Sequence, residues 1–172
     1  WFNSFFGILR PSEGTTNASM NGKTIRLLVN GVDTGLTAVT ANNAAGGGLD
    51  GEFYLPTPTS LVSGDIVTMF VDNDASVDAV TVTKTNASSF SGFELIQNYI
   101  VARYETGASL TNTNLDTANN GDTDITSLYN NGTTTTLTTL AGSTLYVNTG
   151  DIYVPGGAMT FGGNFKVAAT VT

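Results

Sequence analysis

The side chains that most often perform acid–base or nucleophilic chemistry are scarce in this chain. Its 172 residues include no histidine and no cysteine, and only six are lysine or arginine. A Ser–His–Asp triad and a thiol nucleophile therefore cannot form. We predict that the protein is not an enzyme.

Carboxylates are the remaining groups with catalytic potential. A pair of them can hydrolyse a glycosidic bond when the two lie roughly 5 Å or roughly 6.5–9.5 Å apart. Glu13, Glu52, Glu94 and Glu105 have the longest reach, but no pattern in the sequence places two of them together. Surface carboxylates are the favoured interpretation, and a carbohydrate-active enzyme is the least favoured of the functions considered.

Calcium is the best candidate for a small ligand, because two stretches of the chain are rich in oxygen-bearing side chains. Ca²⁺ takes roughly six to eight oxygens from carboxylates, amides and carbonyls. One stretch is Asp72–Asp78, and the other has the sequence DTANNGDTD. The candidate ligands in the second stretch are Asp116, Asn120, Asp122 and Asp124. It departs from an EF-hand loop because Ala118 stands at a ligand position, and polar turns use the same residue types for backbone reasons. Both interpretations stay open, and no other cofactor is predicted.

Large apolar side chains at the two ends of the chain are a sharper signal. Four aromatic rings exposed near a terminus would be a liability, and burying each contributes very roughly 1.5–3 kcal/mol. They form either the first strand of the chain's own sandwich or a strand that completes the sheet of a neighbouring copy. The last strand can play the same role. The candidate assembly residues are Trp1, Phe2, Phe5, Phe6, Ile8, Phe165 and Val167.

Composition and charge narrow the partners and the location. The net charge is −8 and the basic residues are scattered, which disfavours nucleic acid and anionic membranes. No stretch approaches the roughly 18 apolar residues of a membrane span. Only 12% of the residues are charged, so solubility depends on Thr, Ser and Asn, as is common in extracellular and cell-surface β-proteins. The start at Trp1 predicts removal of a leader or excision from a longer protein.

Period-2 alternation dominates the first half of the chain, up to Thr85. Lys23–Asn30 (KTIRLLVN) and Val32–Thr40 flank Asn30-Gly31, the strongest short signal for a hairpin. Short β-segments recur through this region and predict an antiparallel, immunoglobulin-like sandwich at residues 1–85. A break rich in Ser, Asn and Gly at 86–92 predicts a boundary, so residues 86–172 form a second β-rich domain or continue the same sandwich.

The second half is also predicted to be β-rich. Phe93–Tyr104 is interpreted as two strands rather than a helix, and Asp124–Tyr129 as one helical turn. Apolar triplets begin at Leu145, Ile152, Met159 and Phe165, with turns between them. They are either rungs of a short solenoid or a meander with tight turns, and the meander is favoured.

Several segments resemble a known group of modules. FFGILRPSEG, NGKTIRLLVNG, SGDIVTMFVDN and VTVTKT are similar to immunoglobulin-like or transthyretin-like sandwiches of large repetitive secreted bacterial surface proteins, and LYVNTGDIYVPGG is similar to the segments that follow them. The resemblance implies extracellular display and repetition, and it implies no catalytic residues. The aromatic cluster at the start departs from it.

We therefore expect an all-β structural subunit of an extracellular filament or surface layer. Copies of the chain would assemble by strand complementation, so the main partner is the chain itself. The alternative is an adhesin module that binds glycan or another cell surface.

Overall fold

The structure is a computed structural model, and it describes residues 3–57, 61–86, 90–105 and 109–168. The strands are β1 (Asn3–Arg10), β2 (Thr24–Val29), β3 (Val32–Val39), β4 (Glu52–Thr57), β5 (Ile66–Asp72), β6 (Val80–Lys84), β7 (Phe90–Ile96), β8 (Tyr99–Arg103), β9 (Tyr129–Asn130), β10 (Leu137–Thr139), β11 (Thr144–Val147), β12 (Met159–Phe161) and β13 (Asn164–Val167). The helices are η1 (Ala18–Met20, a 3-10 helix), α1 (Asn112–Ala118) and α2 (Thr123–Thr126). The all-β prediction is confirmed.

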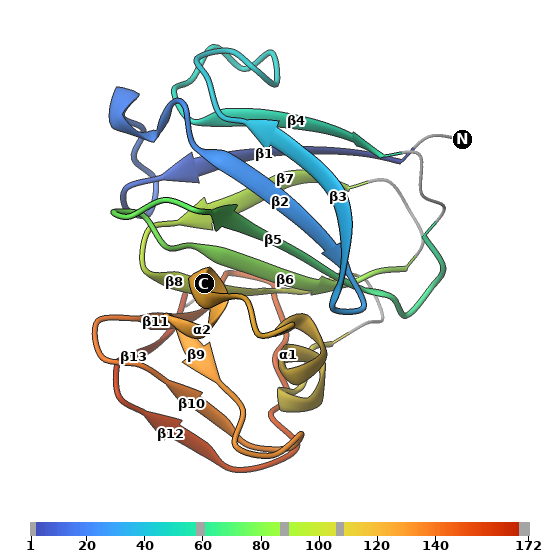
Figure 1. The fold of residues 1–172 in the computed structure, drawn as a ribbon. Helices are drawn as coiled ribbons and strands as arrows, with labels where there is room; N and C mark the ends of the chain where they lie inside the picture. The colour runs from blue at the N-terminus through green and yellow to red at the C-terminus, as the bar shows by residue number, and fades with distance from the viewer. Residues whose placement is uncertain (1–2, 58–60, 87–89, 106–108, 169–172) are drawn as a thin grey trace.

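The strands form three sheets, and the largest of them is the central layer of the molecule. A seven-stranded sheet has the order β13-β11-β8-β6-β5-β2-β3. A sheet of order β4-β1-β7 packs on one face of it, and the small sheet β12-β10-β9 lies beyond its other face (Figure 1). The sheets are mixed, because β1 pairs with β7 and β6 pairs with β8 in parallel.

The hairpin of β2 and β3 forms where the sequence predicts it. Asn30 and Gly31 both have positive φ, 51° and 74°, as a two-residue turn of type I′ requires. Asn30 also accepts the amide of Ile66 through its side chain at 2.8 Å, which ties the turn to β5. The turn residues therefore set the register of two neighbouring strand pairs.

The seven-stranded sheet is covered on both faces. The first core lies between it and the β4-β1-β7 sheet, and includes Phe5, Leu9, Ile25, Leu27, Phe53, Leu55, Val67, Met69, Val71, Phe93 and Leu95. The second core lies on the opposite face, and includes Leu28, Ile66, Phe70, Val80, Val82, Ile100, Ala102, Leu110, Leu115, Ile125, Tyr129, Leu137, Leu145 and Val147. All seven residues of β5 are buried, because alternate side chains enter the two cores.

Strands from beyond the predicted boundary at 86–92 complete the first half. β7 pairs with β1 in the β4-β1-β7 sheet, and β8 pairs with β6 in the seven-stranded sheet. The prediction of two strands within Phe93–Tyr104 is confirmed, and Asn98 with a φ of 65° makes the turn between them. Both cores therefore depend on the same sheet.

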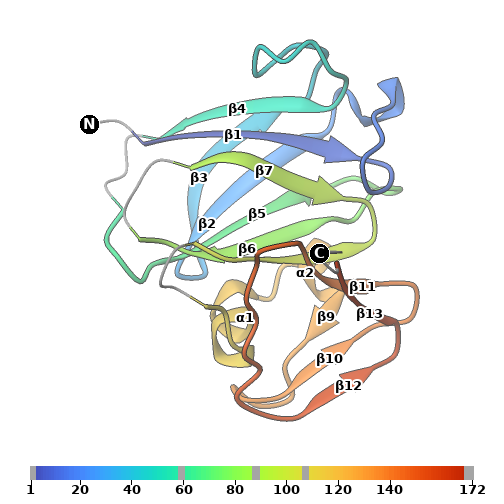
Figure 2. The same ribbon diagram turned by 180° about the vertical axis from the view of Figure 1, so that it is seen from behind.

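The C-terminal part winds as stacked parallel coils rather than as a meander. β11 pairs in parallel with β8 and with β13, and β10 pairs in parallel with β12. Tight turns between neighbours give antiparallel pairs, so the favoured meander is wrong and the solenoid alternative describes the fold. We name β8 and Leu110 coil 1; β10, β11 and Tyr153 coil 2; and β12 and β13 coil 3. Figure 2 shows β12 next to β10 and β13 next to β11.

Consecutive apolar triplets are successive sides of the winding chain, and only the first and the last, which begin at Leu145 and Phe165, are stacked on each other. Thr144 pairs with Asn164, and Leu137 pairs with Met159, so one full coil separates the members of each pair. The shorter spacing between triplets in the sequence is thus the distance from one side of a coil to the next.

A polar excursion between coil 1 and coil 2 covers the second core. Within it, α1 buries Leu115 and Ala118, and α2 buries Ile125. A capping box joins Thr111 to Asn114 and starts α1, which the sequence pattern did not predict. The single helical turn expected near Asp124–Tyr129 corresponds to α2, just before the strand β9.

Candidate functional site

The N-terminal assembly candidates lie in a strand whose two edges are occupied by the chain's own strands. β1 pairs with β4 on one side and with β7 on the other. Phe5 is fully buried with its ring edge-on to Phe93, and Phe6 packs on Tyr54 at the surface. Ile8 is partly buried, and Trp1 and Phe2 lie outside the described residues. The structure places this segment in the chain's own sandwich, so β1 is not free to complete another sheet.

The C-terminal candidates lie at a margin of the seven-stranded sheet. Phe165 and Val167 belong to β13, the outermost strand on that side, and are 49% and 57% exposed. The ring of Phe165 stacks on Phe161 of β12, with centroids 5.3 Å apart and planes at 18°. Coil 3 therefore presents aromatic surface at the end of the solenoid.

The exposed apolar residues of coil 3 occupy inward-facing positions. Val80, Ile100, Leu145 and Phe165 are paired in turn across β6, β8, β11 and β13, and they form one column of side chains. The first three are fully buried in the second core, whereas Phe165 is half exposed. The column is apolar throughout, so only the lack of a covering layer among the described residues exposes its last member.

The same relation holds on the other pairs of coil 2 and coil 3. Thr139 is fully buried and its partner Phe161 is 40% exposed; Val147 is buried and its partner Val167 is exposed. Paired residues of parallel strands point to the same face. Coil 3 thus continues the interior of the solenoid with nothing described beneath it.

Coil 3 stacks closely on coil 2 because glycines stand at the points of contact. A Cβ on Gly163 would collide with the carbonyl oxygen of Ser143, and one on Gly157 would collide with that of Thr135. The turns that these glycines predict in the sequence are therefore also places of close backbone approach.

A buried amide fastens the two coils to helix α1. Asn112 is fully buried, and its Nδ2 donates to the carbonyl oxygens of Thr135 at 2.8 Å and Ala158 at 3.0 Å. Its Oδ1 accepts a hydrogen bond from the hydroxyl of Tyr153. This side chain bridges the segments that lead into β10 and β12, next to the backbone hydrogen bond from Leu137 to Ala158.

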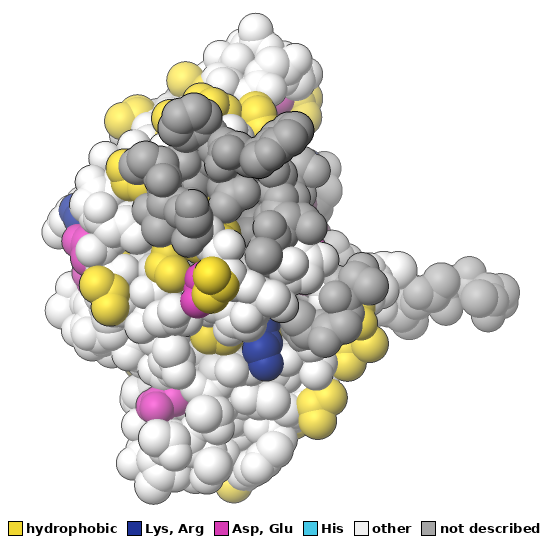
Figure 3. Space-filling view, turned by 90° about the vertical axis from the view of Figure 1, so that its right-hand side faces the viewer, with side chains coloured by type: hydrophobic (Ala, Val, Ile, Leu, Met, Phe, Trp, Pro, Cys, Tyr) yellow, Lys and Arg dark blue, Asp and Glu magenta, His cyan; other side chains and the backbone are white. Residues whose placement is uncertain are grey.

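The other margin of the seven-stranded sheet is β3. Val32 and Val39 at its two ends are 68% and 60% exposed, while Leu36 and Ala38 pack against the first core. Figure 3 shows apolar side chains in separate groups and few charged side chains on the face it draws. β3 itself carries one charged residue, Asp33, so the margin is weakly charged and partly apolar.

The two oxygen-rich stretches meet in space although they are far apart in sequence. The backbone amide of Asn73 donates to Oδ2 of Asp124 at 2.7 Å. Burial raises the pKa of Asp124, and the negative charges of Asp122, Asp78 and Asp72 raise it further, against the hydrogen bond from Asn73. The Asp124 carboxyl therefore keeps its proton to a higher pH than an exposed aspartate does.

Three of the four candidate calcium ligands, Asn120, Asp122 and Asp124, nevertheless accept hydrogen bonds from backbone amides. Asp122 caps α2 by accepting the amide of Asp124 at 3.0 Å, and Asn120 accepts the amide of Asp122 at 3.1 Å. Asp116 lies on α1. Across the described ranges, no three acidic side chains are grouped so that they could hold a metal ion. The arrangement matches the polar-turn interpretation of DTANNGDTD.

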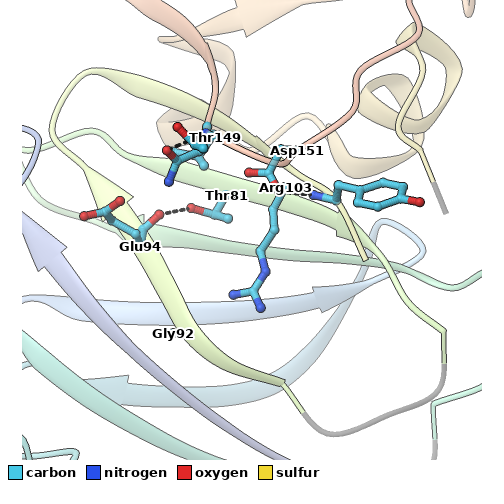
Figure 4. Close-up of a pocket in the computed structure, with 9 residues that line it drawn as sticks. Thr81, Gly92, Glu94, Arg103, Thr149 and Asp151 are labelled. Atoms are coloured by element: carbon cyan, nitrogen blue, oxygen red, sulfur yellow. Dashed lines mark hydrogen bonds between the residues drawn. The ribbon is translucent and has the colours of Figure 1, made fainter. Parts of the chain in front are cut away.

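A polar pocket opens between the β4-β1-β7 sheet and coils 1 and 2. It encloses about 250 Å³, and its lining includes Thr81, Glu94, Arg103, Asn148, Thr149 and Asp151. Figure 4 shows Thr81 between Glu94 on one side and Arg103 with Asp151 on the other. Thr81 donates its hydroxyl to the carbonyl oxygen of Glu94 at 2.6 Å, which joins the two sheets at the floor of the pocket.

The charged groups of the pocket have structural partners. Glu94 pairs with Arg10 at 2.5 Å, and Arg103 pairs with Glu105 at 2.7 Å. Burial raises the pKa of Asp151, and the backbone amide of Tyr104 and the charge of Arg103 oppose this shift. The pocket can offer hydroxyl, amide and carboxylate groups to a small polar ligand.

The remaining long carboxylates of the sequence analysis lie apart from one another and are also engaged. Glu13 accepts hydrogen bonds from the ammonium group of Lys166 at 2.7 Å and from the hydroxyl of Tyr99 at 2.8 Å. The hydrogen bond from Lys166 is the main reason that the pKa of Glu13 is lowered. Glu52 is buried and accepts three backbone amides from the glycine-rich loop 45–49. These carboxylates organise the fold.

Sequence reasoning missed Asn112 and Asp151, which carry the coil contact and one wall of the pocket. Asn112 opens a helix that no pattern in the sequence predicted, and Asp151 lies in one of the turns between the apolar triplets. The capping pattern at Thr111–Asn114 is the local signal that could have placed Asn112.

Comparison of the chain with protein-family models, with curated proteins and with solved structures found no match. The resemblance to immunoglobulin-like modules stays a prediction. Among the described residues we find no helix with the length and apolar character that a membrane crossing requires.

Proposed function

We propose that this chain is a structural part of an extracellular filament or surface layer, and that copies of it join by strand addition at the β3 margin of the seven-stranded sheet. The observation that carries the proposal is that one continuous sheet ends in two margins, β3 and β13, which both display exposed apolar side chains. An uncovered edge strand offers unpaired main-chain groups to another strand.

The β3 margin is the one that an intact copy can offer to another. Thr40 donates its amide to the carbonyl oxygen of Lys23 at 2.9 Å on the β2 side, so the amides of Thr37 and Val39 point to the outer side of the sheet. Just beyond β3, the amide of Ala41 also points outward and donates to Glu52 of β4 at 2.8 Å, so the open part of this margin ends at Val39. Two β3 strands related by a two-fold axis can pair in antiparallel fashion and join their sheets. The low proportion of charged residues favours such a contact, and the composition is typical of extracellular proteins.

Sedimentation equilibrium and negative-stain microscopy test this proposal. We expect concentration-dependent association of the unaltered chain, and Val39→Lys should weaken it at least about tenfold by placing a charge on the margin. Val62→Lys is the matched control, because Val62 is as exposed as Val39 but lies outside the sheet. A chain that stays monomeric at all concentrations, or equal effects of the two variants, would contradict the proposal.

An adhesin module is the second candidate, and the polar pocket favours it. The hydroxyl, amide and carboxylate groups around its 250 Å³ are of the kinds that bind sugar hydroxyls. A glycan array probed with the unaltered chain and with Asp151→Asn tests it. Glycan binding that Asp151→Asn abolishes would support the adhesin module, and an array without signal would exclude it.

A further inference from the structure

The last coil of the solenoid has an interior face but no described layer to cover it. Met159, Phe161, Phe165 and Val167 stand in register with residues of coil 2 that are all buried in the second core or beside it. Met159 is partly buried, and the side chains of the other three coil 3 residues are 40–57% exposed. Aromatic and branched side chains at such positions are suited to packing under another layer of strands.

The opposite end of the solenoid is closed. β8 of coil 1 pairs with β6, which belongs to the sandwich half of the seven-stranded sheet. The helices α1 and α2 add apolar side chains to the second core on that side. Within the described residues, the stack of coils is therefore left open beside β13 and β12.

The free edge of β13 also has the right main-chain groups. Asn164 and Ala168 donate their amides to Ser143 and Val147, on the β11 side. Since successive amides of a strand point to opposite edges, those of Phe165 and Val167 point away from β11. A parallel strand placed there would accept these amides and repeat the pattern by which β13 joins β11.

We infer that the open face of coil 3 binds a further β-solenoid coil, which enters parallel to β12 and β13 and covers Phe161, Phe165 and Val167. The partner is defined by its chemistry: about 20 residues to a turn, glycine at the corners, and apolar side chains at the inward positions. Continuity carries the inference, because β6, β8, β11 and β13 already follow one another in parallel with a single apolar column.

A second intact copy does not meet this description. Its own coils are closed by the sandwich at one end, so it can present only the open face of coil 3, and two such faces would meet in antiparallel fashion. The inference deepens the proposed structural function and rests on it for the biological role of the contact. It concerns a different margin from β3, so the two can fail separately.

The test adds one coil to the chain. The segment 148–167 is duplicated directly after Val167, which supplies one full period of the solenoid, as the pairing of Val147 with Val167 defines it. In the control, the same duplication carries serine in place of Met159, Phe161, Phe165 and Val167 of the added copy. Amide hydrogen exchange is then measured in both variants and in the unaltered chain, together with the thermal unfolding midpoint.

We expect the apolar duplication to slow the exchange of the Phe165 and Val167 amides by about tenfold or more and to raise the unfolding midpoint, and the serine control to do neither. Equal exchange in the two duplications would overturn the inference. So would a concentration-dependent dimer of the unaltered chain that protects these amides, because the occupant would then be a second copy. Loss of association through β3 in sedimentation would instead affect only the proposed function.

Discussion

The two ends of the chain place phenylalanines in comparable strands with opposite outcomes. Phe5 in β1 is fully buried because β4, β7 and the seven-stranded sheet surround it, whereas Phe165 in β13 is half exposed although its column is apolar. Both residues point toward a core. The difference lies in the neighbouring layer and not in the residue, so burial in this molecule depends on how many layers are stacked.

The sandwich and the solenoid are therefore stabilised in different ways. The sandwich half closes on itself, and its first core is covered by sheets on both sides. The solenoid half is covered by the sandwich at one end and has an apolar face without a described cover at the other. A repeat structure gains much of its stability from the interface between neighbouring units, so the last unit is the weakest.

Truncating the two phenylalanines should give the largest difference between the halves. Phe5→Ala removes a fully buried ring and is expected to cost about 3–5 kcal/mol of unfolding free energy. Phe165→Ala removes a half-exposed ring and should cost about 1 kcal/mol or less. Chemical denaturation of both variants measures these costs. Similar losses in the two variants would mean that coil 3 is as well packed as the sandwich.

Removing the side-chain amide of Asn112 should separate coil 3 from the rest of the molecule. Asn112→Ala leaves the carbonyl oxygens of Thr135 and Ala158 and the hydroxyl of Tyr153 without this partner, and we expect a loss of about 2–3 kcal/mol. Hydrogen exchange should show that β12 and β13 open before β5. Thr113→Ala, an exposed neighbour on α1, is the control and should change little. Uniform destabilisation of all strands would contradict the role of Asn112 as the fastener of the coils.

Acid should act on the sandwich half through Asp74. Burial acts to raise the pKa of this carboxyl, but hydrogen bonds from Lys23 and Ser76 outweigh it and lower the pKa from 3.8 to about 2. The group therefore contributes stability above pH 3.8 that is lost as the pH falls toward 2, on the order of 2 kcal/mol.

Asp74→Asn should accordingly be less stable than the unaltered chain at pH 7 and should show a flatter stability profile between pH 4 and about pH 2. Urea denaturation across this range measures the effect. Asp116→Asn on α1 makes the same change of charge as a control. An unchanged profile in Asp74→Asn would show that the ion pair with Lys23 does not hold the sandwich.

Much of the fold could be predicted from local patterns, and the stacking of the coils could not. Asn30-Gly31 fixes a hairpin by its own backbone preference, so the sequence predicts β2 and β3 directly. The parallel pair of β11 and β13 joins Thr144 to Asn164 across a whole coil, and no local preference encodes it. Local patterns show instead the shorter distance between sides of one coil, and that distance favours a meander.

The candidate surfaces divide in the same way. Phe165 and Val167 are predicted at an assembly margin from their position in a terminal apolar strand, and they do lie at a sheet margin. Phe5 is grouped with them because composition alone does not show that β7, which begins only at Phe90, pairs beside β1. The contribution of Asn112 depends on Thr135, Ala158 and Tyr153 arriving from three other segments.

Residue-resolved amide exchange of the unaltered chain at two protein concentrations tests the central claim that one sheet has two open margins of different kinds. We predict that in dilute solution the amides of Phe165 and Val167 exchange rapidly while those of β5 are protected, and that higher concentration slows exchange at Thr37 and Val39 only. Protection of Phe165 and Val167 equal to that of β5 in the dilute monomer, or no response of β3 to concentration, would contradict the account.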